Sequence, residues 1–148
     1  MGEHLSSLIV EALMRIQSPS QIALLIATPP TPDEPAMRND QLAMTQALLA
    51  RGLPADRIFS LHGQLDRPLV LAFLRAARRR MDDWKAGSLF IHVSGDGYFV
   101  GETAETARPG LEFSATGDPT DDYHLLWDDF FAALDLPAGV RLTLLPDL

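Results

Sequence analysis

The sequence predicts a three-layer α/β/α sandwich with a mainly parallel sheet, and three observations favour this fold class. Apolar runs of strand length alternate with amphipathic stretches of helix length along most of the chain. Residues 22–27 are apolar at every position, which is typical of a strand covered on both faces. Residues 89–93 form a second short run, apolar except at His92, and it ends at Ser94 and Gly95. Strands that alternate with helices of this length imply crossover connections and parallel pairing.

The amino-terminal part predicts a helix and a strand before a proline-rich loop. Residues 5–16 place apolar side chains on one helical stripe, and Pro19 ends the helix. The first strand, residues 22–27, follows directly. Residues 28–35 contain four prolines, which interrupt regular backbone hydrogen bonding, so we expect an exposed connector there. Residues 1–20 are therefore an amino-terminal helix attached to one globular domain.

The remaining elements follow from the same two periodicities. A helix is expected at 36–51 because apolar side chains recur at helical spacing until Gly52. The other expected elements are a strand at 57–61, a long amphipathic helix at 67–84, a strand at 89–93, a helix at 121–136 and a final strand at 140–145. Residues 94–120 have no steady periodicity, which predicts a long loop or a small hairpin.

Composition excludes several classes of function. The chain has 148 residues and no cysteine, so disulfides, thiolate metal sites and thiol nucleophiles are absent. Its formal net charge of −8 argues against a nucleic-acid binder, because affinity for phosphate backbones depends on Lys and Arg. No apolar run approaches the roughly 20 residues that span a bilayer, and the amino terminus lacks a signal-peptide pattern. We therefore expect a cytoplasmic protein that binds neither nucleic acid nor membrane.

One basic run stands out in this acidic chain. Arg75 and residues 78–80, all arginine, lie in the predicted helix at 67–84. Basic side chains in the last turn of a helix interact favourably with the helix dipole. We expect a solvated helix face, and a patch for an anionic partner is the alternative.

Five short motifs occur in a fixed order from residue 39 onward. They are Asn-Asp at 39–40, a short strand ending in Leu at 58–61, Leu-Phe-Ile-His-Val-Ser-Gly at 89–95, Asp-Asp at 121–122 and Leu-Pro-Ala-Gly-Val-Arg-Leu-Thr at 136–143. In order and spacing, these motifs resemble the caspase-like cysteine peptidases, and metacaspases in particular. The resemblance covers residues 21–148 and implies a caspase-like fold for them.

The same resemblance locates both catalytic positions of the family and shows that neither residue is present. The family's histidine position holds Asp96, in a loop formed by Ser94, Gly95 and Gly97. The family's cysteine would follow Asp147, just past the last residue, and the later edge strands have no counterpart, so the resemblance implies a C-terminally truncated sheet. A cysteine peptidase needs a thiolate and an imidazole near neutral pH, so activity by the family mechanism is excluded.

These departures predict a catalytically inactive caspase-like domain, a pseudopeptidase that serves as a protein-binding or regulatory module. We expect no cofactor and no bound metal. Free sheet edges invite pairing, so a protein partner or a second copy of the chain is expected at the strand 140–145. Two alternatives remain open. In one, the carboxylates of Asp96 and Asp147 act as a hydrolase, with or without a metal ion; in the other, the chain is a fragment of a longer caspase-like peptidase.

Two further groups of polar residues have simpler interpretations. His92 lies two residues before a serine, too far along a strand for Ser–His contact, so we expect a buried, hydrogen-bonded histidine. The run of Asp118, Asp121 and Asp122 suits Ca²⁺, and calcium dependence occurs in the resembling family. Thr120 or Asp121 is also a good N-cap for the helix that follows, and we expect capping.

Overall fold

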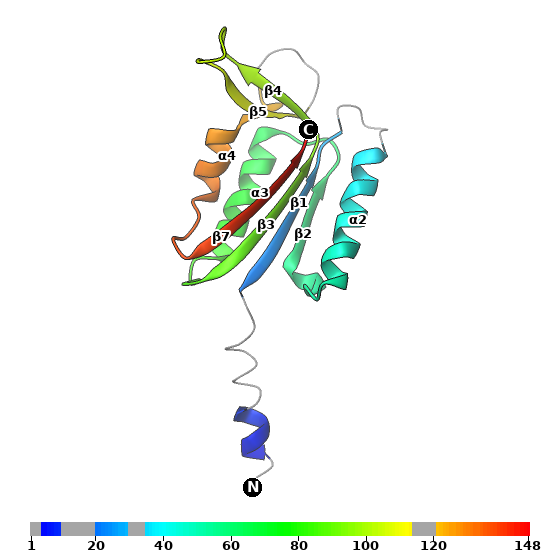
Figure 1. Cartoon of the computed structure of the whole chain (residues 1–148), viewed down its shortest axis with the longest axis vertical. Coiled ribbons are helices and arrows are strands. Elements are labelled where there is room, and N and C mark those ends of the chain that lie inside the picture. Colours follow the sequence, from blue (N-terminus) through cyan, green and yellow to red (C-terminus); the bar gives the residue numbers. More distant parts are fainter. Residues whose placement is uncertain (1–3, 10–19, 30–34, 114–120) are drawn as a thin grey trace.

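The computed structural model describes residues 4–9, 20–29, 35–113 and 121–148, and it is an α/β fold built on two sheets (Figure 1). Four parallel strands form the main sheet in the order β2-β1-β3-β7. These are β1 (Gln21–Ala27), β2 (Ile58–His62), β3 (Gly87–Ser94) and β7 (Val140–Asp147). The second sheet is antiparallel and comprises β4 (Asp96–Val100), β5 (Arg108–Glu112) and β6 (His124–Leu126). The helices are α2 (Ala36–Ala50), α3 (Arg67–Arg80), α4 (Trp127–Leu134) and a 3₁₀ turn, η1 (Ala55–Arg57).

β1 lies inside the main sheet because it pairs with both β2 and β3. Residues 22–27 are all buried, as their unbroken apolar run predicts. Alternate side chains of this strand point to opposite faces of the sheet. One set packs in the main core, where α3 and α4 cover the sheet, and the other set faces α2. The predicted parallel sheet with helices is therefore confirmed.

The main core lies between the sheet and helices α3 and α4. Its buried strand residues share one face of β1 and β3; they are Ile22, Leu24, Ile26, Leu89, Ile91 and Val93. The helices contribute Val70, Leu74, Ala77, Phe130 and Leu134. Burying one such side chain stabilises the fold by about 1.5–3 kcal/mol, so this layer supplies most of the apolar stabilisation.

On the opposite face, α2 is held to the strands by a buried glutamine. Gln41 is 1% exposed, and its side-chain amide donates to the carbonyl oxygens of Leu25 at 3.0 Å and Leu61 at 3.1 Å. Arg38 Nη1 donates to Gln41 Oε1 at 2.6 Å. Because these carbonyls belong to β1 and β2, α2 covers that half of the sheet.

The predicted helix over 121–136 is wrong in its first third. Residues 124–126 form β6, which pairs with β5, and α4 begins only at Trp127. Asp121 does not cap this helix. Its carboxylate accepts hydrogen bonds from Tyr123 N and His124 Nδ1, both at 2.8 Å. The buried side chain of Leu125 fits the helical spacing, but in the fold it enters the core from a strand.

Other boundaries differ by a few residues. The helix predicted over 67–84 ends at Arg80, and the last strand continues to Asp147. In the irregular region, the hairpin alternative is confirmed by β4 and β5. Of the predicted helix over 5–16, the structure describes residues up to 9, which are helical, and the rest lies outside the described residues. Within the described part of the chain, no helix is both long and apolar enough to cross a bilayer.

Candidate functional site

The backbone closes tightly where the parallel strands end, at the place where the sequence predicts the site. Thr28 follows β1, and its N–H donates to the carbonyl oxygen of Ser94 at 2.9 Å. Gly95 follows β3, and its N–H donates to the carbonyl oxygen of Asp147 at 3.1 Å. The ends of β1, β3 and β7 are thereby joined, and Ser94, Gly95 and Asp147 come together as expected. Asp96 is the next residue and begins β4.

Gly95 is required here by a close approach of two backbone segments. A Cβ at Gly95 would lie 2.5 Å from Thr28 Cγ2 and 3.3 Å from the Thr28 carbonyl oxygen. Gly97 differs, because a Cβ there would lie 3.5 Å from Leu148 Cδ1, an ordinary contact. Neither glycine has a positive φ. In place of the loop expected over Ser94, Gly95 and Gly97, the chain passes from β3 into β4 with one bend at Gly95. Of the two glycines, Gly95 is the one that fills a place closed to a side chain.

Asp96 and Asp147 lie at the same end of the sheet, but nothing couples their side chains into a catalytic pair. Asp147 is exposed and Asp96 is half-buried. Among the described residues, neither carboxylate has a hydrogen-bond or ion-pair partner. The described part of the chain also contains no cluster of three or more metal-ligating side chains. For the calcium alternative, Asp118 lies outside the described residues, and Asp121 is engaged with His124.

His92 is buried, as predicted, but it is not fully hydrogen bonded. The residue is 6% exposed on β3, and its Nδ1 atom has no partner among the described residues. The same is true of Thr28 Oγ1, which is buried beside Gly95. Buried polar atoms are usually satisfied, so these two atoms mark the least well-paired part of the interior.

A histidine cluster that no sequence motif indicated lies beside Asp96. Glu112 pairs with Asp96 across β4 and β5, and its Oε1 lies 3.4 Å from His124 Nε2. His124 is 3% exposed, and its Nδ1 lies 2.8 Å from Asp121 Oδ1. Both ring nitrogens thus face carboxylates rather than the hydroxyl group of a nucleophile. The Asp-x-x-His spacing at 121–124 was the one signal in the sequence, and the contact with Glu112 depends on strand pairing.

Tyr98 and Arg67 complete this cluster. The Tyr98 ring packs edge-on against His124 with ring centroids 4.6 Å apart. Burial is the main cause that raises the Tyr98 pKa above its usual 10.0. Arg67 Nη1 donates to the carbonyl oxygens of Asp121 at 3.0 Å and His124 at 3.2 Å. The cluster therefore joins the small sheet to the start of α3, which is a structural role.

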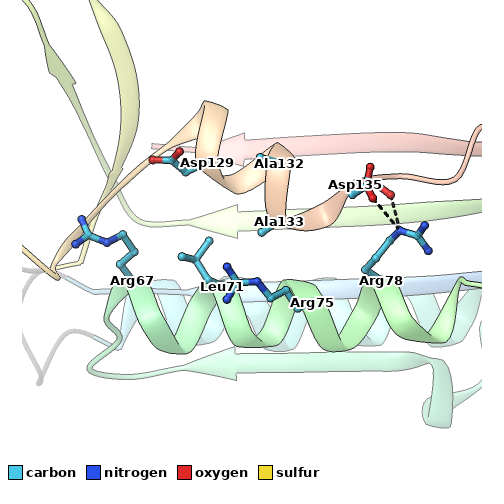
Figure 2. A pocket seen from close by; sticks show the side chains of 8 residues that line it. All are labelled: Arg67, Leu71, Arg75, Arg78, Asp129, Ala132, Ala133 and Asp135. Carbon is cyan, nitrogen blue, oxygen red and sulfur yellow. Dashed lines mark hydrogen bonds and ion pairs between the residues drawn. The ribbon is translucent and has the colours of Figure 1, made fainter.

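The basic run lies beside a groove of about 520 Å³ between α3 and α4 (Figure 2). Three guanidinium groups line it, from Arg67, Arg75 and Arg78. Arg78 Nε donates to the Asp135 carbonyl oxygen, and its Nη1 donates to the carboxylate of Asp82, two residues past the end of α3. Arg75 has no polar partner among the described residues. Two aspartates, Asp129 and Asp135, line the same groove, so it is not a uniformly cationic surface.

The comparisons with known proteins give no family for this chain. No family model matches it, and no curated protein matches it either.

Proposed function

We propose that this chain is a catalytically inactive caspase-like domain that works as a protein-binding module, with a second copy of itself as the partner. The ordered motifs at 39–40, 58–61, 89–95, 121–122 and 136–143 support the family assignment. A parallel sheet in the order β2-β1-β3-β7 is compatible with it.

The absence of catalysis rests on chemistry. The chain has no cysteine to form a thiolate, and the position of the family's histidine holds Asp96. A carboxylic acid with a reference pKa of about 3.9 is ionised at neutral pH and is a poor proton donor there. The buried histidine of the small sheet that contains Asp96 is His124, and its two ring nitrogens face Asp121 and Glu112. These residues form a structural cluster rather than a dyad with a nucleophile.

The free edge of β7 is the observation that carries the binding function. β7 pairs with β3 through eight residues and is the last strand in the sheet order, with no strand on its outer side among the described residues. Arg141 and Pro146 stand near its two ends, and residues 142–145 between them carry no charge. Leu145 is 46% exposed. Charges and proline are the usual protection of a sheet edge, so this uncharged stretch is the place where another strand can pair.

Analytical ultracentrifugation of the full chain tests this function. We expect the average mass to rise above the monomer value of 16.3 kDa with increasing micromolar concentration. The double variant Thr143→Lys/Leu145→Lys should remain monomeric, because lysines on an edge strand oppose strand pairing. Leu69→Lys is the matched control, since Leu69 is 43% exposed on α3 and lies away from β7. A monomeric wild-type chain, or equal association of the double variant, would contradict the proposal.

A further inference from the structure

The face of the sheet that carries α2 is left uncovered at its last strand, β7. α2 packs on β1, β2 and β3, as Gln41 shows through its bonds to β1 and β2. On β7 the side chains that point to this face are all exposed; they are Arg141, Thr143, Leu145 and Asp147. The opposite face of the same strand is half-buried against the main core. The third layer of the sandwich is therefore incomplete above β7 and the first part of β3, where Phe90 is half-buried. Farther along β3, His92 and Ser94 are buried on this face.

A groove of about 330 Å³ runs along this open area beside α2. Its apolar wall comes from Leu48 and Leu53 at the end of α2, and its floor includes Phe90 of β3 and Thr143 of β7. Phe90 and Thr143 are register partners, so they lie next to each other on the sheet. The groove thus lies between the end of α2 and the exposed strand β7, and the apolar side chain of Phe90 lines it between them.

The amino-terminal helix carries an apolar stripe that is not covered. Residues 4–9 are helical, and Leu5, Leu8 and Ile9 are 63%, 51% and 53% exposed. Their spacing of three and four residues places them on one side of the helix. Figure 1 shows this helix beyond the amino end of β1, away from the sheet. Soluble chains rarely leave such a stripe uncovered, and it is normally the face that packs on a core.

The point of attachment brings this stripe to the open face. Ser20 lies at the amino end of the groove, where its carbonyl oxygen accepts a hydrogen bond from Ser88 N at 2.8 Å, and Gln21 and Ser88 line the groove itself. Residues 10–19 separate the helix from Ser20. Ten residues reach at most about 35 Å, and an eight-residue strand is about 27 Å long, so the helix reaches any part of the face.

We propose that residues 4–9 dock on the open face of β3 and β7 in the groove beside α2 and complete the third layer. The occupant is the chain's own helix, because a segment of the same polypeptide has an effective concentration of the order of millimolar, above that of a second copy at micromolar concentration. Leu5, Leu8 and Ile9 then cover Phe90 and the exposed side chains of β7. This docking concerns the face of β7 and is independent of pairing at its edge.

Disulfide trapping in the full chain tests the docking, because a chain without cysteine contains only the thiols that are introduced. The test pair is Leu8→Cys with Thr143→Cys. The control pair is Leu8→Cys with Leu69→Cys, which places the second thiol on α3, an exposed position on the other face of the sheet. Under a mild oxidant, the test pair should form an intrachain disulfide at least about ten-fold faster than the control pair.

A third variant tests whether the apolar stripe drives the docking. Adding Leu5→Asp to the test pair should slow disulfide formation several-fold while the circular dichroism of the folded domain stays the same. Equal rates for the test and control pairs would overturn the proposal. So would a rate that Leu5→Asp leaves unchanged, or a product that is mainly an interchain disulfide between position 8 of one copy and position 143 of another, since the latter would assign the face to a second copy. A disulfide between two copies of position 143 would report pairing at the β7 edge instead.

Discussion

Gly95 provides the sharpest test of how the candidate site is built. A Cβ at this position would lie 2.5 Å from Thr28 Cγ2 and 3.3 Å from the Thr28 carbonyl oxygen. Thr28 is fully buried, and a β-branched side chain has few χ1 alternatives, so its methyl group cannot move aside freely. Gly95→Ala should therefore destabilise the fold although it adds a single methyl group.

The magnitude follows from overpacking. An extra methyl group in a well-packed interior typically costs about 1–3 kcal/mol. For a domain of this size, each kcal/mol lowers the Tm by about 2–4 °C, so Gly95→Ala should lower it by roughly 2–12 °C. Gly97→Ala is the matched control, because a Cβ there would meet Leu148 Cδ1 at 3.5 Å. Its free energy of unfolding should change by no more than about 0.5 kcal/mol.

A double-mutant cycle identifies the atom responsible. Thr28→Ser removes Cγ2 and keeps the hydroxyl group, so the clash with an alanine at position 95 should be relieved. Urea unfolding of the wild type, both single variants and the double variant gives the coupling energy. We expect the double variant to be more stable than the sum of the single effects by at least about 1 kcal/mol. Additive effects, or a loss in Gly97→Ala as large as that in Gly95→Ala, would refute the reasoning.

Three other expectations concern side chains near this site. Asp96→Asn should shift the Tm by less than about 2 °C, because the carboxylate has no polar partner among the described residues. If thermal unfolding shows a Tm lower by several degrees, the Asp96 carboxylate has a structural role. Burial raises the Tyr98 pKa above 10.0 in the folded state. The protonated phenol therefore makes its full contribution to the free energy of unfolding below pH 10, and this contribution is lost as the pH rises through the folded-state pKa. In Tyr98→Phe, the free energy of unfolding should therefore fall less steeply above pH 10.0 than it does in the wild type or in the control variant Tyr123→Phe. An equally steep fall in Tyr98→Phe would contradict this. Finally, the wild-type chain should cleave fluorogenic Arg-, Lys- and Asp-directed peptides at the background rate with or without Ca²⁺, and turnover abolished by Asp96→Ala would overturn the inactive assignment.

The main sheet could be predicted from the sequence because its signals are local. Residues 22–27 and 89–93 are apolar runs of strand length, and both are buried strands in the fold. The strand β6 could not be predicted in this way. Leu125 fits the helical spacing of the residues after it, and only pairing with Leu111 of β5, far away in the chain, makes it a strand residue.

The candidate site was predictable in position but not in detail. Ser94, Gly95 and Asp147 could be placed together because parallel strands share one carboxyl end. The need for glycine at position 95 comes from Thr28, which follows another strand, so no local pattern shows it. The histidine cluster likewise requires Glu112 and His124 to meet across β5 and β6. Contacts of this kind depend on strand register rather than on neighbouring residues.

Amide hydrogen exchange of β7 at increasing protein concentration tests the central claim most directly. The claim is that a second copy pairs with the free edge of Val140–Asp147, so exchange in this strand should slow as the concentration rises through the micromolar range. Ile58–His62 in β2, at the opposite end of the sheet, is the internal reference and should exchange at a constant rate. Exchange in β7 that is independent of concentration, or protection that appears in β2 instead, would contradict the account.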